Sequence, residues 1–364
     1  MTDTSTVTDS RRRPRGSAEP DPRRGGEPEG FRQERPSPRP GDGPKPGWRG
    51  PTYYGRPQLK AAPFENWAVG AYIFLAGLSG ASALVSGVAG VAGGERFGPL
   101  VRRARGLMAL APTIGSALLV WDLHTPKRFY NMLRVAKPTS PMSIGTWILL
   151  AFTSGALPAF AAGWLGERVR ALRWLRRAAD VAHAPAALSG MGLSVYTASL
   201  LSATSTPTWA AAPRALAVRF GASAVAGACA ALRLGERDRG AQAALEAVSA
   251  AALAVELAAG VVQERRFEEV GVDQAMHTAA GRREKLLATG LGVAAPLSLL
   301  AAAWLCRARE EDDAADALAT LASACTLAGG LALRTLVMDV GDQSATRPEI
   351  SFRFTQPRNL PAKP

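Results

Sequence analysis

Ionisable residues interrupt several long apolar runs of this chain, and they are the first candidates for chemistry. Glu256 lies within Ala-Leu-Ala-Val-Glu-Leu-Ala-Ala-Gly, and Arg219 and Arg334 interrupt two other apolar runs. A charge placed in hydrocarbon is costly, so such groups face a cavity or an oppositely charged partner. Two readings of Glu256 and Arg334 stay open from the residues alone: a proton path, or a structural ion pair in which an arginine neutralises the carboxylate.

A second candidate is the polar loop at residues 123–141, which joins two apolar runs. Its donors include Lys127, Arg128, Tyr130, Arg134 and Lys137. Prolines at both ends favour a fixed shape over a loose connector. By charge the loop suits an acidic protein surface or phospholipid headgroups, and a solvated basic loop is the alternative. Asp122 either faces a site there, beside His124, or pairs with a basic residue of the loop.

Several kinds of chemistry find no support in the sequence. The three histidines are His124, His183 and His277, and no two of them are placed to hold a haem between helices. The three cysteines show no paired spacing for zinc or an iron–sulfur cluster. There is no phosphate-binding glycine loop, nucleophile elbow or zinc-protease motif. We therefore predict no catalytic residue and no metal ligand, and any redox chemistry needs a diffusible cofactor or a partner.

The elements that must position these residues are long apolar windows. Mean hydropathy is only +0.02 and net charge is +13, because polar ends and basic loops dilute the apolar runs. Each window is about long enough to cross a bilayer, and tryptophans lie near many of their ends. The windows are 68–93, 104–123, 142–165, 181–204, 210–232, 241–263, 285–306 and 315–338.

These windows predict an all-α integral membrane protein with about eight transmembrane helices. A break at Ser205–Trp209 divides it into two consecutive four-helix bundles, residues 63–205 and 206–340. Residues 1–62 are rich in Arg, Pro and Gly and predict a disordered basic tail, and 341–364 predict a polar C-terminal tail. We expect a multi-pass protein of the cell membrane. Its N-terminus is expected in the cytoplasm, although the arginines of short loops favour the opposite orientation.

The sequence also resembles a known family. Asp122-Leu-x-x-Pro-x-Arg-Phe129, followed by Lys137-Pro-Thr-Ser-Pro-Met-Ser143, is similar to the NrfD/polysulfide-reductase (PsrC-like) family of membrane subunits. Weaker likeness is found in Gly190–Ser202 with Thr206–Trp209, and in Trp67–Gly80. The proline-rich loop and long tail are most like the formate-dehydrogenase-associated type.

The resemblance implies eight helices in two bundles, and a quinone bound in the first bundle beside a docked partner. Carried over by position, it suggests a set of quinone-binding residues: Asn66, Tyr72, Asp122, His124 and Tyr196. Tyr72 and Tyr196 can donate hydrogen bonds to quinone carbonyls, and Asp122 and His124 can relay protons. Tyr72 stands where some relatives carry a histidine. The donor to the quinone would then differ from that of those relatives.

The leading hypothesis is therefore a quinone-interacting membrane anchor of a molybdopterin and iron–sulfur oxidoreductase, inactive alone. The resemblance implies menaquinone as exchangeable cofactor, no haem, and two partners: a ferredoxin-like iron–sulfur subunit and a molybdopterin subunit. Membrane lipid is the other contact, and nucleic acid is not expected. The alternatives are an ion or proton transporter that uses Glu256 and Arg334, and a purely structural anchor.

Overall fold

Apolar runs of this length become helices because a bilayer offers no water to satisfy backbone N–H and C=O groups. A computed structural model describes residues 59–63, 65–123, 126–356 and 359. Eight helical segments in this part of the chain are long and apolar enough to cross a membrane. The prediction of an all-α membrane protein with about eight transmembrane helices is confirmed. The tail at 1–58 and His124 lie outside the described residues.

Six of the eight spans are single α-helices, and five of these precede the seventh span. They are α1 (Asn66–Gly93), α5 (Pro141–Arg168), α6 (Leu175–Ser202), α8 (Pro213–Leu234) and α9 (Arg239–Val270). The last span is also a single helix, α12 (Asp312–Thr346), and it is the longest described. Most of these helices run beyond the apolar windows, because their polar ends continue the helix past the hydrocarbon.

The second and seventh spans are interrupted. The second consists of α2 (Gly98–Met108), a π-helical turn η3 (Ala111–Gly115) and α3 (Ser116–Asp122). Pro112 lies in that turn and has no N–H for the helical ladder, which explains the break. The seventh consists of α10 (Ala279–Arg283), a π-helical segment η7 (Glu284–Ala294) and α11 (Ala295–Ala308).

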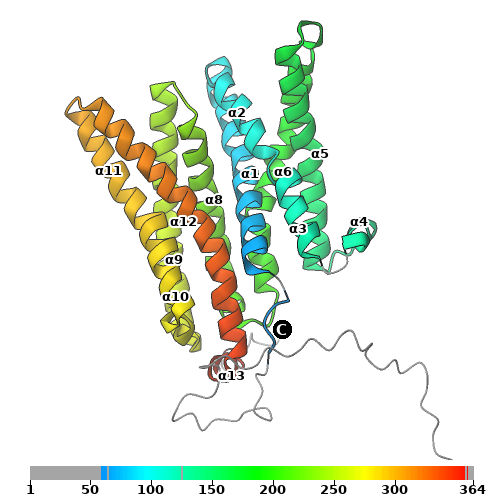
Figure 1. The fold of residues 1–364 in the computed structure, drawn as a ribbon, viewed down its shortest axis with the longest axis vertical. Coiled ribbons are helices and arrows are strands. Elements are labelled where there is room, and N and C mark those ends of the chain that lie inside the picture. Colours follow the sequence, from blue (N-terminus) through cyan, green and yellow to red (C-terminus); the bar gives the residue numbers. More distant parts are fainter. Residues whose placement is uncertain (1–58, 64, 124–125, 357–358, 360–364) are drawn as a thin grey trace, which may run out of the picture. The chain divides into compact units, whose positions relative to one another are not determined.

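Short elements connect the spans. They are η2 (Gly94–Phe97), η4 (Pro126–Arg128), α4 (Asn131–Arg134), η5 (Arg170–Leu172), α7 (Pro207–Ala210), η6 (Asp273–His277) and α13 (Pro348–Phe354). Figure 1 shows α4 projecting beside the start of α5, away from the other helices.

Helix α1 packs against helices from both halves of the chain. It contacts α2 and α6 of the first four spans, and α8 and α12 of the last four. Within the halves, α5 packs on α6, α8 on α9, and α11 with η7 on α12. Because α1 joins both sets, we keep the division into two four-helix bundles as an interpretation.

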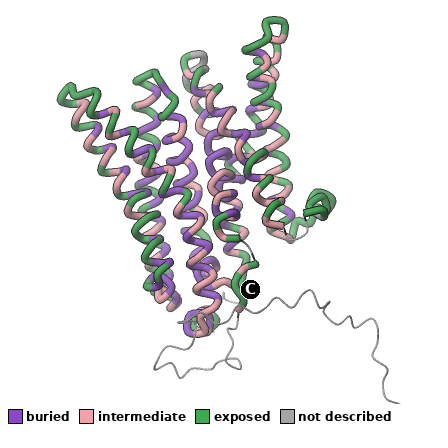
Figure 2. Tube along the Cα trace, viewed as in Figure 1, coloured by how far each residue is buried: buried purple, intermediate pink, exposed green. Residues whose placement is uncertain are grey.

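The outer surface is apolar where a soluble protein would be polar. Large apolar side chains such as Val181, Leu188, Leu286 and Leu305 are more than half exposed. Figure 2 shows exposed residues on the outward faces of the helices and buried residues between them. An apolar exterior of this kind suits contact with lipid tails.

The C-terminal segment differs from the predicted polar tail at 341–364. Helix α12 continues to Thr346, and α13 follows it, with Ile350 fully buried. The reason is local packing: the Thr208 N–H donates to Ser344 Oγ at 3.4 Å, and the ring of Trp209 lies against Gly341, where a side chain would collide with it. Polar residues in this stretch are held by helix geometry and by α7.

Glycines allow α1 and α6 to approach closely. A Cβ at Gly80 would collide with the carbonyl oxygen of Gly190, and one at Gly190 would collide with Gly80. Small residues at helix crossings are the main means of close packing in membranes, where the hydrophobic effect between helices is absent.

We predict that Gly80→Val destabilises the protein by about 1–3 kcal/mol, because overpacking forces these two helices apart. The measurement is thermal unfolding of the detergent-solubilised protein. Gly106→Val is the matched control, since nothing lies within 4 Å of a Cβ added at Gly106 on α2. Equal unfolding temperatures for the two variants would contradict the close crossing.

Candidate functional site

Two tyrosines, Tyr72 buried and Tyr196 half-buried, lie on the neighbouring helices α1 and α6 in the first half of the chain. Tyr72 of α1 is 7% exposed, and its ring lies against Gly115 in the turn η3. Tyr196 of α6 lies within electrostatic reach of Tyr72. These rings come from different helices, and each carries a hydroxyl. The structure therefore brings together two of the five residues predicted to bind quinone.

Tyr196 is also connected to the start of α5. Its hydroxyl donates a hydrogen bond to the carbonyl oxygen of Pro141 at 2.8 Å. Its ring fills the space beside Gly145, so any side chain at position 145 would collide with it. Pro141 is the last residue of the polar loop, so this bond links the half-buried Tyr196 to the loop directly.

Asn66 points in a different direction from Tyr72. Its side-chain amide donates to Asp339 Oδ1 at 2.8 Å and to Asp342 Oδ2 at 2.9 Å, both on α12. Asp342 Oδ1 also accepts the backbone N–H of Ala62. The structure thus places Asn66 against the second half of the chain. Neither aspartate was singled out by the sequence, where both lie at the polar end of the last apolar window.

Asp122 lies at the end of α3, next to the beginning of α1. Its Oδ1 accepts the backbone N–H of Glu65 at 3.0 Å, just before α1 begins. Trp67 and Trp121 pack against each other beside it, with ring centroids 5.4 Å apart. A carboxylate at a helix N-terminus is favoured by the free N–H groups there. Asp122 therefore fastens the second span to the first, a contact the sequence did not predict.

The polar loop presents both charge and apolar surface. Lys127, Tyr130, Arg134 and Lys137 are all exposed. So are its apolar neighbours Phe129, Met132, Leu133 and Val135. An exposed apolar patch with a basic rim is typical of a surface that contacts another protein. The charge pattern of the sequence predicted the basic residues of this surface, whereas the apolar residues between them carry no such signal.

The end of this loop has a fixed shape. Ser143 Oγ donates to the carbonyl of Val135 at 2.8 Å and accepts the N–H of Lys137 at 2.9 Å. Trp147 Nε1 donates to the same Val135 carbonyl at 3.2 Å. These bonds connect the loop to the first turns of α5 and so determine the conformation of the Pro-Thr-Ser-Pro-Met-Ser segment.

A second polar cluster lies inside the last four spans. Arg219 of α8 forms a salt bridge with Glu284 of η7 at 2.6 Å, and donates to Gln263 at 3.2 Å and Thr289 at 3.1 Å. Glu284 was assigned to a loop by the sequence. The π-helical turn carries it inward to this arginine.

Arg334 of α12 is buried and bound mainly by neutral groups. Its guanidinium donates to Ser223 Oγ at 2.5 Å and to the carbonyls of Phe220 and Gly330 at 2.9 and 3.0 Å. Glu256, also buried, lies among Arg219, Arg334 and Ser223. Within the described residues no salt bridge joins Glu256 to either arginine, so the simple ion pair considered from the sequence is not formed.

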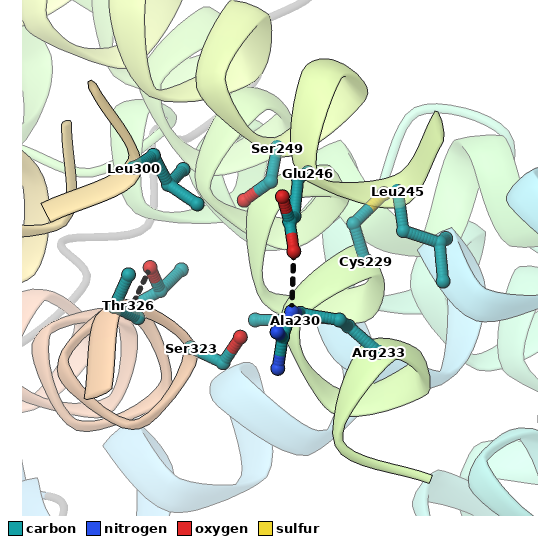
Figure 3. Close-up of a pocket in the computed structure, with 10 residues that line it drawn as sticks. Cys229, Ala230, Arg233, Leu245, Glu246, Ser249, Leu300, Ser323 and Thr326 are labelled. Carbon is teal, nitrogen blue, oxygen red and sulfur yellow. Dashed lines mark hydrogen bonds and ion pairs between the residues drawn. The ribbon is translucent and has the colours of Figure 1, made fainter. Parts of the chain in front are cut away.

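A third cluster closes the opposite end of the same helices. Arg233 Nε meets Glu246 Oε1 at 2.7 Å, and Arg307 also binds Glu246. Arg233 further donates to Thr320 on α12 at 3.0 Å. Figure 3 shows Glu246 in direct contact with Arg233, and both line a cavity between the helices. In the sequence, Glu246 is a charged residue within the apolar window 241–263, and no local pattern indicates its partners.

His183 was set aside by the sequence as unsuited to haem, and the structure places it in the core of the first half. Its Nε2 lies 3.1 Å from the carbonyl oxygen of Ala83 and 3.2 Å from Ser86 Oγ. The carbonyl can only accept, so Nε2 carries a proton that it donates. One helical turn away, the buried Arg105 pairs with Asp180.

Eight helical segments of the described residues are long and apolar enough to cross a membrane, and they define a multi-pass membrane protein. The family model described as polysulphide reductase, NrfD, matches residues 60–344, most of the chain. The chain belongs to the NrfD polysulphide reductase family, and it is a multi-pass protein of the plasma membrane. No curated protein matches it.

Proposed function

We propose that this chain is the quinone-reactive membrane anchor of a multi-subunit molybdopterin oxidoreductase. Electrons would pass between an iron–sulfur partner docked on the polar loop and menaquinone held in the first half of the chain. The observation that carries the proposal is the hydrogen bond from Tyr196 to Pro141. It joins Tyr196, and through it the tyrosine pair, to the loop on which the partner would dock.

The residues present fit a quinone headgroup. Menaquinone, when bound, supplies the exchange of two electrons and two protons. The phenol of Tyr72 can donate a hydrogen bond to one carbonyl. Tyr196 can donate to the other once it releases the Pro141 carbonyl. Asp122 and His124 remain the proposed route for protons to the surface. Asn66 is proposed to act at the edge of the quinone site, through its hydrogen bonds to α12.

The polar loop is the proposed docking surface. Its exposed basic residues Lys127, Arg134 and Lys137 neighbour the exposed apolar residues of α4 and its flanks. The side chain of Arg128, predicted from the sequence to dock the partner as well, lies outside the described ones. Such a surface fits a partner whose contact face is acidic at the edge and apolar at the centre. A ferredoxin-like subunit docked here would bring its nearest cluster toward Tyr196. The assignment to a formate-dehydrogenase-type complex belongs to this proposal.

We predict that the double variant Lys127→Glu/Arg134→Glu loses the partner, because two charge reversals turn attraction into repulsion at the rim. The measurement is recovery of the iron–sulfur subunit with the affinity-purified chain at physiological ionic strength. Arg266→Glu, an exposed arginine on α9, is the control and is expected to retain the partner. Full recovery with the double variant would place the docking surface elsewhere.

A further inference from the structure

We propose that the turn between α5 and α6 is a binding site for the headgroup of an anionic phospholipid. This arginine turn comprises residues 168–177, from the last residue of α5 to the first turn of α6. Figure 1 shows it at the opposite end of α5 from α4, and therefore on the other side of the membrane from the polar loop. The site is distinct from the quinone site and the docking surface proposed above.

The arginine turn carries five positive charges and no carboxylate. All five arginines are exposed, and none forms a salt bridge with another residue that the structure describes: Arg168, Arg170, Arg173, Arg176 and Arg177. Five like charges within ten residues repel one another and attract an anion. The turn therefore has a charge that a ligand can neutralise.

The two carboxylates that flank the arginine turn are already paired with another helix. Glu167, just before the turn, forms a salt bridge with Arg102 at 3.1 Å. Asp180, just after it, pairs with Arg105, and both of these arginines lie on α2. Because α2 occupies both carboxylates, the positive charge of the turn is left for a ligand from outside the chain.

Two of the five guanidinium groups are held by contacts that leave donors free. The Arg168 guanidinium lies over the ring of Trp164, 4.3 Å from the ring centroid. Contact through the flat face leaves its in-plane N–H groups available. Arg176 uses Nε to donate to the carbonyl of Gly166 at 3.1 Å, which leaves its two terminal nitrogens for a ligand. Such planar forks of N–H donors match the oxygens of a phosphate group.

The surroundings of the turn favour a phospholipid over an acidic soluble protein. Phe160 and Trp164 on α5 are exposed, and Val181 on α6 is 74% exposed, so apolar surface continues from the turn along both helices. Trp174, within the turn, is 64% exposed. Tryptophans at the ends of membrane helices lie at the level of the lipid headgroups. A phospholipid places its phosphate among the arginines and its acyl chains along α5 and α6, whereas a soluble acidic protein would match the charge alone.

The ligand is a phospholipid whose phosphate charge is not offset by a cation in the same headgroup. Phosphatidylglycerol is of this kind, and phosphatidylcholine is not. Each basic residue near an anionic lipid surface contributes about fivefold in affinity. The arginine turn should therefore prefer phosphatidylglycerol to phosphatidylcholine.

The test is lipid binding by the full chain, with the subunits that it retains, after removal of lipid in a neutral detergent. Each of the two phospholipids is titrated separately, and native mass spectrometry counts the bound molecules. The wild type is expected to bind phosphatidylglycerol at concentrations at least about tenfold below those needed for phosphatidylcholine. Arg170→Gln/Arg173→Gln/Arg177→Gln is expected to weaken phosphatidylglycerol binding at least about tenfold and to remove the preference.

Arg214→Gln/Arg265→Gln/Arg283→Gln is the matched control, because it removes the same charge from three exposed arginines outside the turn. It is expected to bind phosphatidylglycerol as the wild type does. Equal affinity of the wild type for the two lipids would overturn the proposal, as would an equal loss of affinity in both triple variants. Displacement of phosphatidylglycerol by millimolar inorganic phosphate would also overturn it, since the turn would then be a site for soluble phosphate.

Discussion

Tyr196→Phe is expected to lower the rate of electron transfer to menaquinone about 100-fold, while the complex still assembles. Loss of a positioned proton donor typically costs a factor of this order or more. The hydroxyl is the only group removed, and among the described residues it donates its hydrogen bond to the Pro141 carbonyl. The ring that packs beside Gly145 remains in place.

The measurement is the rate of reduction of a soluble menaquinone analogue by the complex, followed against pH. A structural role for the Tyr196–Pro141 bond would cost only about 1 kcal/mol of stability and would not change the pH profile. Thr146→Val is the control, because it removes a hydroxyl that donates a hydrogen bond to the carbonyl of Met142 within α5. If Tyr196→Phe and Thr146→Val transfer electrons equally fast, the tyrosine pair is not the quinone site.

Glu246→Ala is expected to destabilise the protein by about 3–5 kcal/mol, the usual cost of leaving a buried charge without its partner. The substitution strands Arg233, which is 4% exposed at its side chain, and deprives Arg307 of two contacts. Thermal unfolding in detergent and the yield of folded protein measure the effect.

The control for this prediction is Asp312→Ala. Asp312 pairs with Arg239 at the surface, where both side chains are largely exposed, and such pairs contribute about 0–1 kcal/mol. If Glu246→Ala unfolds at the same temperature as Asp312→Ala, the Arg233–Glu246–Arg307 cluster does not stabilise the fold as its burial indicates.

The spans could be predicted because their signal is local. A run of about 20 apolar residues identifies a transmembrane helix whatever it packs against. The interruptions of the helices were harder to predict. Pro112 accounts for the break in the second span once the structure is known, but the π-helical form of the turn also involves the packing of Gly115 against Tyr72.

The candidate site was predicted only in part. Asn66 and Tyr72 are six residues apart, and the helical period turns their side chains to different faces, so their separation follows from spacing alone. The partners of Asn66, on α12, depend on how distant helices pack and leave no local pattern. The same holds for Glu284 and Arg219, which are brought together by a π-helical turn in a segment that reads as loop.

The most direct test of the central claim is affinity purification of the intact chain from its native membrane, with identification of the bound proteins and lipids by mass spectrometry. We predict recovery of a ferredoxin-like iron–sulfur subunit, a molybdopterin subunit and menaquinone. The Tyr196→Phe variant is expected to retain less menaquinone per protein than the wild type. Recovery of the chain alone, without quinone, would contradict the assignment as a redox anchor.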